Sequence, residues 1–136
     1  NDLIMSALDF CPEIVFMRDP TRGGLATTLV EVATMTNYGI DISESAIGVS
    51  EEVRGICELL GFDPLYIANE GKVIIIVRPN VAESLLARIR NHPLGSKASI
   101  IGTVTEKHPK QVVLQTSVGG KRSLDMLTGD QIPRIC

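Results

Sequence analysis

The chain ends in a cysteine, Cys136, which closes the run Pro133-Arg134-Ile135-Cys136. The residues before this run, 126–132, include Gly129 and show no helical period of apolar side chains, a pattern typical of a tether. A thiol on a tether can act as a covalent carrier or substrate arm, because it can travel between reaction partners. The alternative is a terminal cysteine without a function, since chain ends are usually loosely held.

A second stretch that could do chemistry is Arg18-Asp19-Pro20-Thr21-Arg22-Gly23-Gly24, the densest cluster of polar and glycine residues in the chain. The short apolar run 13–17 before it predicts a strand. The residues after it predict one face of a helix, because apolar side chains recur at i, i+4, i+7 and i+8: Leu25, Leu29, Val32 and Ala33. A helix N-terminus at this loop offers unpaired N–H donors and the positive end of the helix dipole, and glycines let a ligand approach the backbone.

Two functions remain open for this loop. Asp19 and Arg22 could hold a bare or metal-bound phosphate at the start of the helix. Alternatively, Asp19 or Thr21 only caps the helix and Gly23-Gly24 only forms a turn, since capping is a common use of such residues. The loop matches neither a P-loop nor a G-x-G-x-x-G fingerprint.

The carboxylate of Glu70, in the stretch Ala68-Asn69-Glu70-Gly71, is a further candidate. The aliphatic run 73–77 follows this stretch and predicts a strand. A carboxylate beside a glycine at the entrance to a strand is presented by a rigid element and could act on a substrate. The alternative is a solvated turn, because polar residues are common in loops.

The rest of the chain predicts the scaffold that must position these residues. Helices are expected at 2–10, 50–60 and 81–91, and short strands at 40–42, 99–104, 111–115 and 123–125. The alternation of helices and strands predicts a layered α/β or α+β domain with a mixed sheet flanked by helices. Cys57 lies on the apolar face of the second of these helices, with Val53, Ile56 and Leu60, and is expected to be an inert core thiol. Both histidines, His92 and His108, lie in polar loops and are expected to be solvated.

Composition and charge exclude several classes of protein. The net charge is −3 and aromatic residues make up 4%, with no basic cluster, which argues against nucleic-acid binding. No apolar run is long enough to span a bilayer. The three cysteines, Cys11, Cys57 and Cys136, are far apart and odd in number, which argues against a disulfide framework or a zinc site and fits a reducing cytoplasm. A length of 136 residues predicts one domain, and the start at Asn1 suggests a fragment of a longer protein.

Four stretches of the chain, in this order, resemble the HypE family of hydrogenase maturation proteins. They are Asp19-Pro20-Thr21-Arg22-Gly23-Gly24-Leu25, Ala68-Asn69-Glu70-Gly71, His92-Pro93-Leu94-Gly95 and the terminal Pro133-Arg134-Ile135-Cys136. The resemblance covers nearly the whole chain and is to the C-terminal domain of that family, which is of the aminoimidazole ribonucleotide synthetase type. The first two stretches are shared with selenophosphate synthetase and thiamine monophosphate kinase, whereas the terminal run singles out HypE.

The resemblance implies a function in making the cyanide ligands of nickel-iron hydrogenases. A carbamoyltransferase, HypF, would load a carbamoyl group onto Cys136. ATP-dependent dehydration would then convert it to a thiocyanate, with Glu70 as the base, and the cyano group would pass to iron on a HypC–HypD complex. ATP and Mg²⁺ are the implied cofactors. Asp19, Thr21, Arg22, Gly23 and Gly24 are the residues of this chain expected to contact the nucleotide phosphates, and no residue of this chain is expected to bind a resident metal.

The resemblance also predicts the domain organisation. Residues 1–125 would form the C-terminal domain and 126–136 a flexible tail that carries the acceptor cysteine. The family's N-terminal domain, which supplies most of the nucleotide site and the homodimer contacts, is absent from this chain, so we expect the chain by itself to be inactive. The alternative function is a non-catalytic docking or carrier module that displays the cysteine tail to maturation partners.

Overall fold

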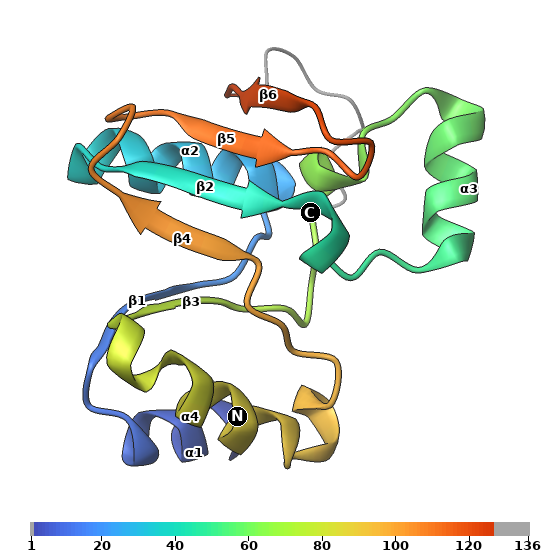
Figure 1. Cartoon of the computed structure of the whole chain (residues 1–136). Helices are drawn as coiled ribbons and strands as arrows, with labels where there is room; N and C mark the ends of the chain where they lie inside the picture. Colours follow the sequence, from blue (N-terminus) through green and yellow to red (C-terminus); the bar gives the residue numbers. More distant parts are fainter. Residues whose placement is uncertain (1, 127–136) are drawn as a thin grey trace. The chain divides into compact units, whose positions relative to one another are not determined.

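The computed structural model describes residues 2–126 (Figure 1). These residues group into two compact units, one formed by 2–19 with 73–100 and the other by 20–72 with 101–126. The single domain expected over residues 1–125 stays a prediction. Except for Met126, the expected tail lies outside the described residues.

The first unit consists of two helices and a two-stranded sheet. Helix α1 (Asp2–Phe10) leads into β1 (Ile14–Arg18), which pairs antiparallel with β3 (Ile74–Val77), and α4 (Pro79–Arg90) follows β3. The core is formed where α1 and α4 bury Ala7, Cys11 and Leu85 against aliphatic side chains of the sheet. The predicted helices and strands of this unit are therefore confirmed to within two residues at each end.

The second unit contains a mixed four-stranded sheet. Its strands are β2 (Gly39–Ser43), β4 (Gly102–Thr105), β5 (Val112–Gln115) and β6 (Lys121–Leu124), in the order β4-β2-β5-β6. Strand β2 is antiparallel to β4 and parallel to β5, and β5 is antiparallel to β6. Helix α2 (Gly24–Thr36) runs along the sheet in Figure 1. The predicted mixed sheet flanked by a helix is confirmed.

Side-chain alternation along the strands explains why this sheet has one apolar face. Alternate residues of the two central strands are buried, Ile40 and Ile42 in β2 and Val112 and Leu114 in β5. Successive side chains of a strand point to opposite faces, so all four belong to one layer. Helix α2 supplies the other half of this core with Ala26, Leu29, Val30 and Ala33.

The two strands on either side of the polar turn 106–110 are consecutive in the chain but are not neighbours in the sheet, because β2 lies between β4 and β5.

The prediction that His108 in this turn is solvated is wrong. Its Nε2 atom lies 3.1 Å from Asp41 Oδ1, with the two side chains 25% and 45% exposed. Its backbone has φ 41, and a side chain at Gly39 would overlap its ring, so the turn closes tightly over the start of β2.

His92 is likewise less exposed than predicted. This residue is half-buried at the start of the short 3₁₀ helix η3 (Pro93–Gly95), where its Nδ1 accepts a hydrogen bond from the Leu94 N–H at 3.2 Å. It lies in a surface loop as expected, with a local capping role that the sequence analysis did not assign.

Helix α3 (Glu51–Leu60) is confirmed as a helix, but its predicted apolar face is mostly not buried. Ser50 is the N-cap and Gly61 the C-cap, as expected from their types. Of the apolar face, only Cys57 is buried, at 2% exposed, whereas Val53, Ile56 and Leu60 are all more than 40% exposed. Cys57 is therefore a core thiol, and the rest of the face meets solvent in the described part of the chain. Within residues 2–126, no helix is both long enough and apolar enough to cross a membrane.

Candidate functional site

The start of α2 has no side-chain cap. Gly23 is the N-cap residue, its backbone is left-handed with φ 66, and no side chain caps it by a hydrogen bond. The alternative that Asp19 or Thr21 caps this helix is therefore wrong. The first N–H groups of a helix have no partner inside the helix, so this N-terminus keeps donors available for an anion.

Gly24 is the point where α2 meets a segment far away in the sequence. Its φ is +66, and a Cβ atom there would lie 2.5 Å from the carbonyl oxygen of Leu65 and 2.7 Å from that of Ile67. These carbonyls belong to the short 3₁₀ helix η2 (Pro64–Tyr66) and the residue after it. Glycine is required at this position because both the backbone conformation and the close approach exclude a side chain.

A backbone hydrogen bond joins the two predicted loops directly. The N–H of Asn69 donates to the carbonyl of Pro20 at 3.0 Å. Residues 20–24 and 68–70 are almost fifty positions apart, yet they lie side by side in the second unit. The tertiary structure therefore brings Thr21, Arg22 and the α2 N-terminus to the loop that carries Glu70.

Thr27, in the first turn of α2, is a residue that the sequence analysis did not single out. Its side chain is only 7% exposed, packs against Gly23, and its hydroxyl is buried without a hydrogen-bond partner in the described structure. A buried hydroxyl that is left unpaired costs free energy.

The predicted site residues differ in their placement. Thr21 is half-buried, whereas Arg22 and Glu70 are exposed at the surface of the second unit. Asp19 is exposed too, but it ends the first segment of the other unit. Cys136 lies outside the described residues. The structure thus brings together Thr21, Arg22, Gly23, Gly24 and the Glu70 loop.

Two polar links tie η2 to the last strand, and no pattern in the sequence indicated them. The Tyr66 hydroxyl donates to the carbonyl of Asp125 at 2.9 Å and accepts from the Asp125 N–H at 3.2 Å. The guanidinium of Arg122 donates to Asp63 Oδ2 at 2.6 Å. The other oxygen of Asp63 accepts from the Leu65 N–H and begins η2.

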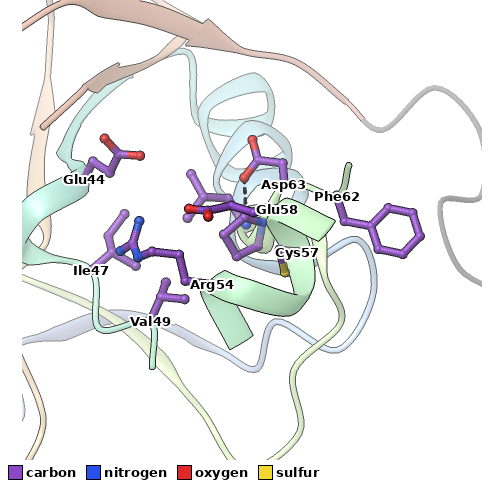
Figure 2. A pocket seen from close by; sticks show the side chains of 10 residues that line it. Glu44, Ile47, Val49, Arg54, Cys57, Glu58, Phe62 and Asp63 are labelled. Atoms are coloured by element: carbon purple, nitrogen blue, oxygen red, sulfur yellow. Dashed lines mark hydrogen bonds between the residues drawn. The ribbon is translucent and has the colours of Figure 1, made fainter. Parts of the chain in front are cut away.

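A small cavity lies between α3 and η2 (Figure 2). Its volume is about 100 Å³, and it is lined by apolar groups such as Cys57 and Leu65 and by charged residues that include Arg54 and Glu58. At its edge, the carboxylate of Glu44 accepts a hydrogen bond from the Ser117 N–H at 2.7 Å. This bond and one from the Ser117 side chain lower the pKa of Glu44, with a smaller contribution from Arg122 and Arg54.

Among the residues that the structure describes, no three or more His, Cys, Asp or Glu side chains are placed to hold a metal ion. The described site therefore offers helix N–H donors, a guanidinium, hydroxyls and a carboxylate. This combination suits a phosphate-containing ligand and a proton transfer.

The fold and the site define an α/β domain in which a glycine loop leads into the uncapped N-terminus of a helix. The chain belongs to the AIR synthase related protein family and matches the model of its C-terminal domain over residues 3–115. Within that family, the chain is similar to the carbamoyl dehydratase HypE of Azotobacter vinelandii, with 50% identity over all 136 residues. The chain spans 40% of the length of that relative.

Solved structures of related proteins have the same fold. A crystal structure of hydrogenase maturation protein HypE matches the whole chain with 44% identity and a TM-score of 0.92, over 44% of its own length. A HypE structure in complex with ATP matches 91% of the chain, with 47% identity and a TM-score of 0.83, over 38% of its length. A HypE–HypF complex matches 93% of the chain, with 39% identity and a TM-score of 0.86, over 41% of its length.

Proposed function

We propose that the full-length protein that contains this chain is an ATP-dependent carbamoyl dehydratase. It converts an S-carbamoyl group on Cys136 to a thiocyanate and so supplies cyanide ligands for nickel-iron hydrogenases. The observation that carries this proposal is the hydrogen bond between Asn69 and Pro20, which places the Glu70 loop against the uncapped N-terminus of α2. Similarity to HypE proteins along the whole chain supports it.

The reaction must remove one oxygen and two protons from the carboxamide. ATP supplies the γ-phosphoryl group that, once on the amide oxygen, makes that oxygen leave as phosphate. The amide nitrogen gives up both protons, the C≡N bond forms as the C–O bond breaks, and the Cys136 sulfur keeps its bond to carbon throughout. The products are the thiocyanate, ADP, phosphate and one proton, and no oxidant or reductant is needed.

The residues around the start of α2 fit the phosphate part of this ligand. The N–H groups of Gly23 and Gly24 and the dipole of α2 favour negative charge at this end of the helix. Arg22 and Thr21 offer a cation and a hydroxyl beside them, and Asp19 directly precedes this loop in the chain.

Glu70 is the proposed base that takes the protons from nitrogen. Its carboxylate is exposed and lies one residue from Asn69, so the bond to Pro20 holds it near the phosphate-binding loop. Glu70→Gln keeps the shape of the side chain and removes its basicity. In the full-length protein this variant is expected to accept a carbamoyl group on Cys136 and to lose at least about a hundredfold in the rate of dehydration. Thiocyanate formation at the normal rate would exclude Glu70 as the base.

Partners and location follow from the same proposal. HypF is the proposed carbamoyl donor, in keeping with the HypE–HypF complex solved for a relative. A HypC–HypD complex that carries iron is the proposed acceptor of the cyano group. We further propose that the full-length protein is a cytoplasmic homodimer.

Intact mass spectrometry tests the function directly. The full-length protein is incubated with HypF, carbamoyl phosphate, ATP and Mg²⁺, and the same protein with Cys136→Ala is the control. The expected result is a gain of one carbamoyl group, followed by the loss of one water only when ATP is present. Both changes should be absent from the Cys136→Ala control. If Cys136 gains the carbamoyl group but never loses water, the protein is a carrier that displays its cysteine rather than a dehydratase.

A further inference from the structure

The segment 63–69, which we call the η2 segment, leads directly into Glu70 and is held from two sides. On one side, two of its carbonyls lie against Gly24 at the start of α2, and its Asn69 N–H donates to the carbonyl of Pro20. On the other side, two of its side chains form hydrogen bonds with β6 and the residue after it. The place of Glu70 beside the start of α2 therefore depends on both sets of contacts.

The contact with β6 has two points, which together we call the β6 clamp. The Tyr66 hydroxyl donates to the backbone carbonyl of Asp125 at 2.9 Å and accepts from its N–H at 3.2 Å. The guanidinium of Arg122 donates to Asp63 Oδ2 at 2.6 Å. The two clamped residues of the η2 segment are three positions apart, and so are their two partners, so the clamp fixes the orientation of the segment as well as its distance from β6.

Strand β6 is the fixed side of this clamp. It pairs antiparallel with β5 along its whole length, from Lys121 opposite Gln115 to Leu124 opposite Val112. Leu124 is 2% exposed and Val112 is fully buried, so the end of β6 nearest the clamp belongs to the core of the second unit. Loss of the clamp would leave β6 in the sheet and release the η2 segment on this side.

The two carboxylate oxygens of Asp63 have separate uses. Its Oδ1 atom accepts from the Leu65 N–H at 2.9 Å and begins η2, whereas its Oδ2 atom takes the bond from Arg122. A substitution at Arg122 therefore removes a link to the sheet and keeps the cap of η2. Likewise, phenylalanine at position 66 fills the space of Tyr66 without either of its hydrogen bonds.

We propose that Tyr66 and Arg122 are positioning residues that set the place of Glu70 at the start of α2 through the η2 segment. This inference rests on the proposed function, because it states how the proposed base is held. A base must lie within hydrogen-bond reach of the proton that it takes, and a displacement of about 1 Å can lower a rate by about a hundredfold. A segment held only from the α2 side would place Glu70 less accurately.

Hydrogen exchange tests the structural part of the inference in the full-length protein. The clamp variant is Tyr66→Phe with Arg122→Met, since methionine keeps an unbranched side chain but has no donor. Its control is Tyr38→Phe with Arg78→Met, which makes the same two changes away from the η2 segment and removes the ion pair of Arg78 with Glu13.

The bond between Asn69 and Pro20 reports on the η2 segment. In the clamp variant, the Asn69 amide should exchange at least about tenfold faster, measured by mass spectrometry on a peptide that spans residues 66–72. Peptides from β5 should exchange as in the wild type, because the sheet stays intact. The control variant should match the wild type in both regions.

Single-turnover kinetics test the effect on the reaction. Full-length protein loaded with a carbamoyl group on Cys136 is purified, and dehydration is started with Mg²⁺ and a range of ATP concentrations. The clamp variant should lose about tenfold in rate at saturating ATP. Its KM for ATP should stay within about twofold of the wild type, because α2 keeps its own packing against the sheet through Leu29 and Ala33.

A Glu70→Gln background separates positioning from general support of the fold. If the clamp acts through Glu70, the two clamp substitutions should cause no further loss of rate once the base is absent, because effects that pass through one group are not additive. A clamp that supports the fold in general would lower the rate by about tenfold in this background as well.

Three results would overturn the inference and leave the proposed function in place. The first is unchanged exchange at Asn69 in the clamp variant, and the second is an unchanged rate despite faster exchange. The third is a further tenfold loss when the clamp substitutions are added to Glu70→Gln. If the loaded wild type does not lose water with ATP, the proposed function fails and this inference fails with it.

Discussion

Replacement of Gly24 by alanine tests whether the packing of η2 against α2 holds the site together. The new Cβ atom would lie 2.5 Å from the Leu65 carbonyl oxygen and 2.7 Å from that of Ile67, both backbone atoms that cannot rotate away. The left-handed backbone of Gly24 costs alanine about 1–2 kcal/mol. Overpacking of a tight contact costs about 1–3 kcal/mol more. The expected loss in the free energy of unfolding is therefore about 3 kcal/mol.

Two other glycines separate these contributions. Gly61 also has a left-handed backbone, but nothing lies within 4 Å of an added Cβ atom, so Gly61→Ala should cost about 1–2 kcal/mol from the backbone alone. Gly55 is inside α3 with open space around it, and Gly55→Ala should stabilise by about 0.5–1 kcal/mol. The free energy of unfolding of all three variants is measured by urea denaturation, with circular dichroism as the signal.

The comparison that decides the matter is Gly24→Ala with Gly61→Ala. If the two lose equal stability, the close approach of η2 to α2 has no energetic weight, and the argument that it positions the Glu70 loop fails. In the full-length protein, Gly24→Ala should also lower the rate of Cys136 dehydration more than Gly61→Ala does, because only the substitution at Gly24 displaces η2.

Two further predictions concern polar contacts in the second unit. Glu44 has a pKa lowered below its ordinary 4.5, so its folded-state bonds stabilise the protein fully above that value and are lost as the pH falls through the lowered pKa. The stability difference between wild type and Glu44→Gln should thus be largest at neutral pH and shrink below about pH 4.5 in urea titrations; a difference independent of pH would contradict this. Asp41→Ala removes the partner of His108 and should cost about 0.5–1.5 kcal/mol in the same assay, and no loss would show that the pair does not secure the turn.

The exposure of α3 shows a limit of periodicity as a guide to structure. The repeat of Val53, Ile56, Cys57 and Leu60 correctly predicts a helix, because the period is a property of the helix itself. The repeat carries no information on how much of the face another element covers. Of these residues, only Cys57 is covered by another element, and Leu59 beside the face is 85% exposed.

The candidate site likewise has features that the sequence predicts and features that it does not. The residue types in 19–24 and 68–71 and the terminal cysteine indicated phosphate binding, a base and a carrier thiol. The order of a strand, the glycine loop and a helix could also be predicted from the sequence, because strands and helices depend on local patterns. The sequence could not show whether Thr21 or Asp19 caps the helix. The cap depends on the backbone of Gly23, which is left-handed.

The sequence by itself determined the elements, their approximate bounds, and the chemistry that each loop could perform, since these follow from side-chain type and local period. The tertiary structure alone decided that residues 20–24 and 68–70 lie side by side, through the Asn69–Pro20 bond and the approach of Leu65 to Gly24. It also decided that Tyr66 bonds to the backbone of Asp125 and that His108 pairs with Asp41. Contacts between residues forty or more positions apart depend on how the whole chain packs, and no local pattern encodes them.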